Sequence, residues 1–491
     1  YFAPFVQDDW KITPRLTLNL GLRYDYFGHL ASIVNDRIPI GKFTLGEGSS
    51  FAEQVANGSM ELRGGDKGYQ TSRIVDGWAP RIGFGWDIFG NGTTALRGGY
   101  GIYYNRLANE AYRVEVNPPR WVDPSISIFD PTPPQFSYAF GPNFQPPPNF
   151  TVQINERGGI VGTRVSAQGL DPFLDPPITH NWMVSLQRTL GSNLFLEADY
   201  AGTHSDKLYV LTDVNRFAGE LVKNNGTLTR LNPFFGGVSY GRSIGIADSH
   251  YGSFMVAKRY SRGLSLRGIF TFGKATDLNS SFCTGPSGCG LVLDALDVAA
   301  QKGRADFNVA RRLTLDSVFE IPVPWKEGVR SKVLGGWRFS TIAIFQGGLP
   351  FSVYTSAPFP NGDFNADGLN WDFPEAPGFG NHVSATRSDF LKGLFKVSDF
   401  PLPTVGQQGN LGRNTFDGPG LANVNVNFSK ATKMPWFSSE GASLEFRAEI
   451  FNLFNRVNLG QPVADLSSGL FGRSVSQDLP RAVQFGLHLS F

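Results

Sequence analysis

Oxygen-bearing side chains recur at alternate positions from residue 363 onward, in the run Asp-Phe-Asn-Ala-Asp-Gly. Carboxylate and amide oxygens at this spacing, followed by a glycine, form the front half of a calcium loop. The predicted metal ligands are Asp363, Asn365, Asp367 and Asp372. Position twelve, where a bidentate Glu is expected, holds Pro374, so an Asx-rich turn stays an alternative. We expect such a calcium ion to stiffen a loop, with no cofactor required.

The two cysteines, Cys283 and Cys289, enclose the run Thr-Gly-Pro-Ser-Gly. A loop this short and rich in turn residues could close as a disulfide in an oxidising envelope compartment. Two free thiols are the alternative. A disulfide between these two residues is therefore the prediction.

One stretch matches the nucleophile elbow of hydrolases, Gly241-Arg242-Ser243-Ile244-Gly245. That motif requires a turn from a strand into a helix, with a histidine and an acid nearby. No helical pattern follows, and the six histidines are scattered singly along the chain. His488, in an alternating strand, is interpreted as a wall residue. We predict that the protein is no enzyme.

Composition points to strands and turns. The 491 residues include 42 Phe, 58 Gly and 32 Pro but only 4 Met, a bias that disfavours helices. The 44 basic and 42 acidic residues nearly cancel, which argues against a nucleic-acid partner. No apolar run approaches the roughly 18 residues of a membrane helix. A membrane role must therefore be carried by strands.

Apolar and polar residues alternate in segment after segment, which predicts strands with one apolar and one polar face. In the last segment Val483, Phe485 and Leu487 face one way, while Gln484 and Gly486 face the other. A soluble sandwich would explain any one such strand. The segments are 2–12, 15–27, 81–89, 93–104, 178–190, 193–204, 249–260, 264–276, 305–320, 336–347, 422–430, 442–454 and 481–491.

Connections between these segments alternate between short turns and long loops, which favours a transmembrane barrel over a sandwich. Tyr and Trp gather toward strand ends, as a membrane interface requires. The polar faces carry both signs, with Arg267 and Arg447 beside Asp199 and Glu445. Because such charges are costly in lipid, we expect this face to line a wet lumen. The loop 105–177 is rich in aromatics that pack loops together or grip a ligand, namely Trp121, Phe136, Tyr138, Phe140 and Phe144.

The expected fold is therefore all-β, an antiparallel transmembrane β-barrel with short periplasmic turns and long extracellular loops. About thirteen strands are visible, and an odd number leaves two edges whose backbone groups lipid does not tolerate. Plugged transporter barrels have about 22 strands. We expect residues 1–491 to be the C-terminal part of such a barrel, with further strands before Tyr1.

Two stretches resemble a known family. The run from Phe5 to Tyr24, FVQDDWKITPRLTLNLGLRY, is similar to the signature of TonB-dependent outer-membrane receptors. It resembles in particular the Oar-like barrels that follow a carboxypeptidase-regulatory-like domain. The run from Phe446 to Asn455, FRAEIFNLFN, resembles their penultimate strand, and the final strand ending in Phe491 resembles the signal that barrel-assembly machinery reads.

The resemblance implies location in the bacterial outer membrane, in contact with its lipid. It also implies uptake of an extracellular ligand, of siderophore, oligosaccharide or peptide class, through a plugged lumen. The plug, the TonB contact and the regulatory-like domain would precede Tyr1. Two alternatives stay open: a surface adhesin or structural barrel without transport, and an open porin.

Overall fold

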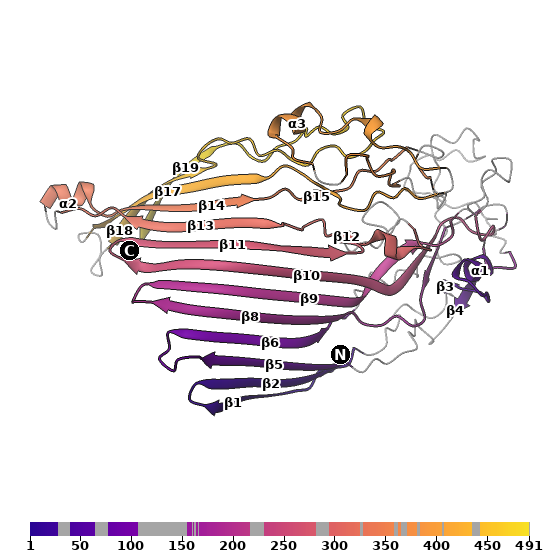
Figure 1. The fold of residues 1–491 in the computed structure, drawn as a ribbon, viewed down its shortest axis with the longest axis horizontal. Helices are drawn as coiled ribbons and strands as arrows, with labels where there is room; N and C mark the ends of the chain where they lie inside the picture. Colours follow the sequence, from indigo (N-terminus) through magenta and orange to yellow (C-terminus); the bar gives the residue numbers. More distant parts are fainter. Residues whose placement is uncertain are drawn as a thin grey trace, which may run out of the picture.

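A computed structural model describes residues 1–27, 40–63, 77–106, 155–159, 161, 164, 166–216, 230–280, 294–324, 328–357, 362–364, 371–380, 383–404, 407–434 and 442–490. Its main feature is a 17-stranded sheet. Thirteen of these strands pair in sequence order, each antiparallel to the next, and form a continuous wall (Figure 1). The wall strands are β1 (Phe5–Thr13), β2 (Leu16–Asp25), β5 (Gly77–Asp87), β6 (Thr94–Tyr104), β8 (Ile178–Leu190), β9 (Leu194–Asp213), β10 (Val238–Ser261), β11 (Leu264–Asp277), β13 (Arg311–Glu320), β14 (Trp337–Gln346), β17 (Leu421–Met434), β18 (Ala442–Phe451) and β19 (Ala482–Ser490).

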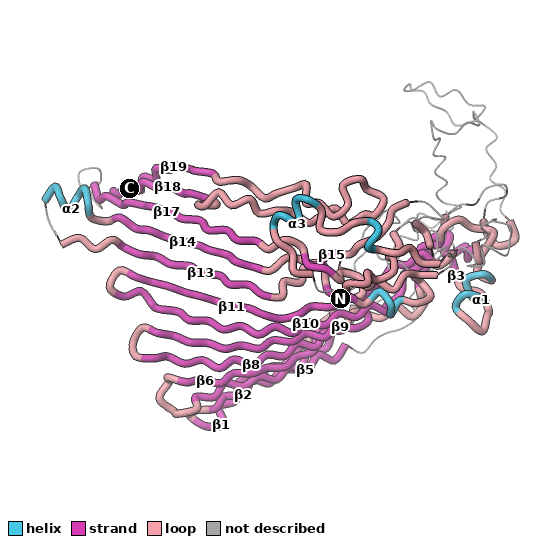
Figure 2. The backbone as a smooth tube through the Cα atoms, turned by 45° about the horizontal axis from the view of Figure 1, so that its top comes forward, coloured by secondary structure: helices cyan, strands magenta, loops and turns pink. Residues whose placement is uncertain are grey.

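Short connections lie at one end of the wall, the turn end, and long ones at the other, the loop end (Figure 2). At the turn end, Arg262 and Gly263 join β10 to β11 with φ of 51° and 77°. Two successive positive φ values match the right-handed twist of the flanking strands. The predicted alternation of short turns and long loops is confirmed.

Short helices and strands lie at both ends of the wall. Helix α2 (Gly328–Leu334) lies at the turn end, between β13 and β14. β7 runs parallel to β10 and touches β3 in one parallel bridge. Within the described ranges, none of the helices has the length and apolarity that crossing a membrane requires. The loop-end elements are β3 (Ile40–Thr44), α1 (Phe51–Ala56), β4 (Ser59–Arg63), β7 (Ala167–Leu170), η2 (Val298–Gln301), β12 (Gly303–Arg304), β15 (Pro350–Phe351), α3 (Arg387–Lys392), η3 (Val397–Asp399) and β16 (Phe416–Asp417).

Some strand boundaries differ from the predicted ones. β10 begins at Val238 because register shifts near Gly245 break the alternation without ending the strand. The strand predicted from residue 305 begins only at Arg311. A turn intervenes there, in which Asn308 Oδ1 accepts a hydrogen bond from the Ala275 backbone N–H at 2.7 Å. A side-chain oxygen thus takes the place of a backbone carbonyl of the next strand. The alternation of apolar and polar residues gives no sign of such a substitution.

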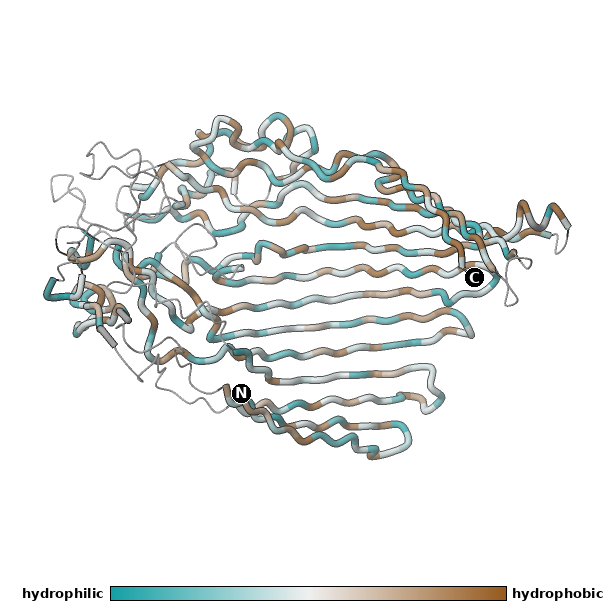
Figure 3. Tube along the Cα trace, turned by 180° about the vertical axis from the view of Figure 1, so that it is seen from behind, coloured by the Kyte–Doolittle hydropathy of each residue, from teal (hydrophilic) through white to brown (hydrophobic). Residues whose placement is uncertain are grey.

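The wall has two chemically different faces, and colours alternate along its strands accordingly (Figure 3). Cross-strand partners share a face, so Leu18 beside Phe84 and Phe254 beside Phe270 extend one apolar face across the sheet. Its side chains are exposed, with Leu487 at 72%. An apolar surface of this extent marks contact with something other than water. A few carboxylates also lie on the apolar face, such as Asp8 on β1 and Asp248 on β10.

Two edges bound the wall. Among the described strands, β1 pairs only with β2, and β19 pairs only with β18. Figure 1 shows these strands at opposite margins of the sheet. Each edge presents a row of backbone donors and acceptors without a strand partner. The wall is therefore an open, curved sheet rather than a closed cylinder.

Apolar cores at the loop end show that the long connections are folded. Rim core A joins loops from both sides of β17, and rim core B joins β3, β4, β7 and the extended ends of β9 and β10. Core A contains Phe351, Val353, Phe373, Phe395, Phe400, Leu411, Phe416, Leu466 and Phe471. Core B contains Phe43, Val55, Met60, Ala167, Val214, Phe235, Val238, Tyr240 and Ala295.

Candidate functional site

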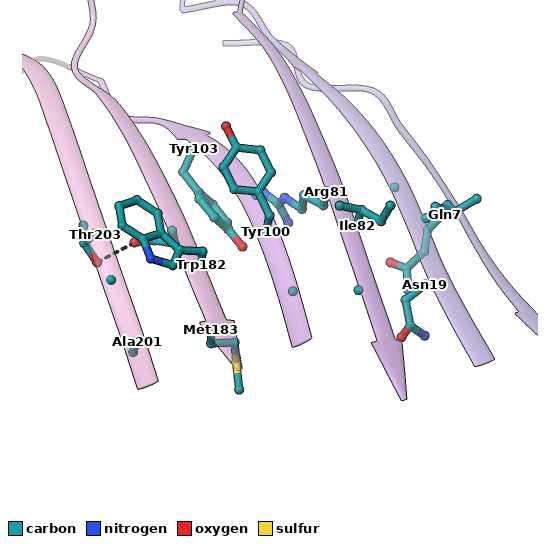
Figure 4. A pocket seen from close by; sticks show the side chains of 17 residues that line it. Gln7, Asn19, Arg81, Ile82, Tyr100, Tyr103, Trp182, Met183, Ala201 and Thr203 are labelled. Carbon is teal, nitrogen blue, oxygen red and sulfur yellow. Dashed lines mark hydrogen bonds between the residues drawn. The ribbon is translucent and has the colours of Figure 1, made fainter. Parts of the chain in front are cut away.

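A groove of about 480 Å³ crosses strands β1 to β9. The strand register places two neighbouring rows of side chains on the polar face along it. Figure 4 shows the lining residues and the strands that carry them. The first row is Gln7, Gly21, Arg81, Gly101, Asn181 and Thr203; the second is Asn19, Gly83, Gly99, Met183 and Ala201.

The groove exists because its floor lacks side chains. Gly83 and Gly99 occupy adjacent positions of the second row, and Ala201 follows beyond Met183. Other parts of the polar face carry charged or amide groups at such positions. A Cβ added at Gly83 would lie 3.5 Å from Asn19 Oδ1, an ordinary contact distance. The space above the floor is therefore open, and its volume falls within the range of small-molecule sites.

Polar groups border the groove. The Arg81 guanidinium carbon lies 4.5 Å from the centre of the Tyr103 ring, a cation–π contact that holds the positive charge at the rim. Thr203 Oγ1 donates to Asn181 Oδ1 at 2.8 Å. A fixed guanidinium beside amides and hydroxyls can bind a polar ligand that carries a carboxylate or phosphate.

Beyond the groove, opposite charges pair across the polar face. Arg267 Nε lies 2.7 Å from Asp316 Oδ1 on the neighbouring strand. Arg447 Nη2 lies 2.7 Å from Glu445 Oε2 on its own strand, with His488 opposite that glutamate. The prediction that this face carries both signs of charge is confirmed, and His488 stands in the wall as predicted.

At the loop end, burial changes the acidity of Asp213. Burial raises the pKa of its carboxyl, although Val238 N–H donates to it at 3.0 Å and Asn215 N–H at 3.2 Å. The same carboxylate closes the join between β9 and β10 where they enter rim core B. It is a structural group that ties strand ends together.

The predicted calcium ligands fall partly within the described residues. Asp363 and Asp372 are buried in the loops, at 3% and 0% exposure. Asn365 and Asp367 lie outside the described residues, as do Cys283 and Cys289. In the part of the chain that the structure describes, no three His, Cys, Asp or Glu side chains are grouped to hold a metal. The calcium site and the disulfide stay predictions.

The nucleophile-elbow match is a strand. Ser243 lies within β10, and its hydroxyl bonds the backbone of Asp175, donating to the carbonyl at 2.9 Å and accepting from the N–H at 3.1 Å. Its role is to hold the segment before β8 against β10. The aromatic residues of loop 105–177 named above lie outside the described residues.

Three of the histidines, although scattered singly along the chain, come close together in the structure. His180, His204 and His250 meet on the apolar face near the loop end, on three consecutive strands. The ring centres of His180 and His204 are 6.2 Å apart. A signal existed in the sequence, because His180 and His204 lie equally far from the turn that joins β8 to β9. Hairpin partners are found by counting outward from the turn.

Comparison with known proteins agrees with this architecture. A family model described as "Outer membrane beta barrel domain" matches residues 1–484. No curated protein matches the chain. Similar solved structures include the outer membrane transporter YddB from Escherichia coli, with TM-score 0.49 and 10% identity over 99% of this chain and 53% of that chain.

Two further similar structures have TM-scores of 0.44. The siderophore receptor PiuA from Acinetobacter baumannii is 9% identical, over 99% of this chain and 42% of that chain. The FrpB iron transporter from Neisseria meningitidis is 10% identical, over 99% of this chain and 45% of that chain. The chain thus spans about half the length of these solved structures.

Proposed function

Because this chain belongs to the outer membrane beta barrel domain family, we propose that it forms part of the wall of a TonB-dependent receptor. Such a receptor captures an extracellular ligand and draws it through a plugged lumen. The loop end then faces outward and the turn end faces the periplasm. The work of the protein is binding and gating, without a catalytic step.

The separation of the two faces carries the proposal. Exposed apolar side chains form one face, which suits hydrocarbon. Paired charges such as Arg267 and Asp316 occupy the other. Facing lipid at the bilayer midplane would cost about 2–4 kcal/mol for the arginine and less for the aspartate. The polar face therefore suits a wet lumen along which a polar ligand moves.

The groove supports a ligand-contact role within that lumen. Its glycine floor leaves room, and Arg81, Gln7 and Asn181 supply donors along one side. The ligand classes that fit are siderophores, oligosaccharides and peptides. Among them, a member with an anionic group would pair with Arg81.

The two edges support a larger barrel. In lipid, the backbone groups along β1 and β19 need strand partners. We propose that further strands of the whole protein close the wall, toward the size of a barrel with about 22 strands. A plug and the TonB contact would belong to the same whole protein, and β19 would serve as the signal for barrel assembly.

The test is ligand accumulation in cells carrying or lacking the full-length gene. Radiolabelled ferric siderophores, oligosaccharides and peptides would be supplied with and without a protonophore. We expect one class to accumulate only with the gene and only in energised cells. Accumulation that persists with the protonophore would establish an open porin instead.

The packed loops at the loop end favour a second candidate function, that of a surface adhesin. Rim cores A and B give the loops a packed interior, which suits a fixed surface for binding a partner. In the same experiment an adhesin would retain ligand or partner on the cell surface, with no intracellular label in energised cells.

A further inference from the structure

A cluster of basic side chains interrupts the apolar face near the loop end. This outer-face patch consists of His180, His204, His250, Lys274 and Lys302. The strand register aligns His180 with His204 and Asp248, and it aligns His250 with Lys274. Five basic groups from β8, β9, β10, β11 and the end of η2 thus meet on the side of the wall that contacts lipid.

The histidine rings are oriented by hydrogen bonds at Nδ1. The Tyr100 hydroxyl lies 2.7 Å from His180 Nδ1, and the Tyr200 hydroxyl lies 2.8 Å from His250 Nδ1. When a phenol donates to Nδ1, the proton of a neutral imidazole resides on Nε2. Both rings then carry an N–H donor on the side away from the tyrosine.

Acidic groups offset part of the positive charge. Asp248 accepts from His204 Nδ1 at 2.6 Å and from Lys302 Nζ at 3.0 Å. Asp206, the register partner of Ile178, lies one pair farther toward the loops. Lys274 is exposed, and no ion pair of Lys274 is found among the described residues. The patch therefore presents an ammonium beside imidazole donors.

The surroundings place the patch at the membrane interface. The Trp182 ring centre lies 5.8 Å from that of His250. Tyr100 and Tyr200 flank the histidines, and the apolar face continues below them through Leu186 and Phe254. Such aromatic belts mark the level of lipid headgroups. The patch lies at that level, beside the loops.

We propose that the outer-face patch binds the phosphate of a membrane lipid headgroup. A phosphate offers several strong acceptor oxygens to imidazole N–H groups and to the Lys274 ammonium, and charge-assisted bonds of this kind are strong. Tyrosine and tryptophan would flank the lipid's glycerol and upper acyl region. One lipid held there would anchor the rim of β8 to β11 at a defined depth.

The test is native mass spectrometry of the full-length protein in detergent, with dioleoyl phosphatidic acid as the probe and dioleoyl phosphatidylcholine as the neutral comparison. We expect the wild type to retain phosphatidic acid preferentially. The double variant His250→Gln and Lys274→Gln should bind it at least about tenfold more weakly, because two polar contacts are lost. Circular dichroism would verify that the variant is folded.

Lys433→Gln is the matched control, since it removes one positive charge from the opposite, polar face. It should retain phosphatidic acid as the wild type does. The proposal would be overturned if the double variant retained phosphatidic acid as the wild type does, or if Lys433→Gln lost as much phosphatidic acid as the double variant. It would also be overturned if the wild type retained phosphatidylcholine as well as phosphatidic acid. Displacement by millimolar inorganic phosphate alone would also overturn it, because the site would then prefer a free ion to a lipid.

Discussion

At the scale of single residues, aromatic rings lie over glycines on neighbouring strands. Trp182 covers Gly202, Phe84 covers Gly98, and a Cβ built on these glycines would lie 2.3 Å and 2.5 Å from the rings. A ring can lie flat on the sheet only where the neighbour has no side chain. This pairing buries aromatic surface and protects glycine backbone in the wall.

Adding a side chain at Gly202 should therefore destabilise the wall. We expect Gly202→Val to cost about 1–3 kcal/mol, because Trp182 must leave its position. Urea unfolding of the full-length protein in lipid vesicles measures the change. Gly85→Val is the control, since a Cβ there meets nothing within 4 Å. Equal stability of the two variants would contradict this account of Trp182.

The groove gives a second prediction at this scale. Gly83→Leu fills its floor without a close contact, whereas Gly85→Leu places the same side chain outside the lining. We expect Gly83→Leu to reduce ligand accumulation in energised cells at least about tenfold. A tenfold reduction corresponds to a loss of roughly 1.4 kcal/mol in the free energy of ligand binding in the groove. Gly85→Leu should transport normally. An equal reduction of accumulation in both variants would show that the ligand does not pass through the groove.

Asp465 gives a pH dependence at the rim. Burial opposes ionisation, but hydrogen bonds from Ser356 and Ser467 outweigh it and lower the pKa of this carboxyl. A folded pKa below the unfolded value of about 3.9 stabilises the loops above that pH. The stabilisation is lost as pH falls through the folded pKa.

Pepsin digestion of the full-length protein checks this. From about pH 4.5 to pH 2.5, cleavage within 350–357 should rise in the wild type. Asp465→Asn should already be cleaved at the higher pH, while the exposed Asp478→Asn should follow the wild type. Cleavage of Asp465→Asn at the wild-type rate would show that the carboxylate does not hold these loops.

At the scale of elements, rim core A packs aromatic rings from loops that are distant in sequence. Phe416 lies 4.7 Å from Phe395 and 5.9 Å from both Phe351 and Phe400, between ring centres. The loops after β14 and before β19 therefore share one interior. Their order comes from this packing, and the wall strands supply only its base.

Phe416→Ala should lower the free energy of unfolding of rim core A by about 3–5 kcal/mol, because the substitution leaves a cavity among the aromatic rings. Hydrogen exchange of the full-length protein should speed up at the residues of rim core A, while β13 and β14 keep their protection. Phe379→Ala, at a half-exposed ring on the core's edge, should have a smaller effect. Loss of protection in the wall itself would mean that rim and wall fold as one unit.

At the scale of the whole molecule, the open edges decide how residues 1–491 behave alone. Each edge needs a partner in lipid, so this segment by itself should not form a monomeric barrel. We expect refolding in detergent to give aggregates without the heat-dependent shift in gel mobility of closed barrels. A monodisperse, heat-modifiable product would show that β1 and β19 can pair, and it would refute the larger barrel.

Local pattern in the sequence determined the fold class, the strand count and the face on which most wall side chains lie. Alternation predicted that Leu18 and Leu20 share an exposed apolar face and that Arg267 and Glu445 lie opposite it, because neighbouring residues of a strand point to opposite sides. Turn residues such as Arg262 and Gly263 likewise act within a few positions.

Only the tertiary structure decided which side chains of different strands and loops lie next to one another. Gly83 and Gly99 form a groove with Ala201 only through the register of four strands. His204 lies beside Asp248 only through the pairing of β9 and β10. Bulges near Gly245 shift that pairing, and rim cores join loops far apart in sequence. These contacts depend on long-range packing free energy, which leaves no periodic trace in a single strand.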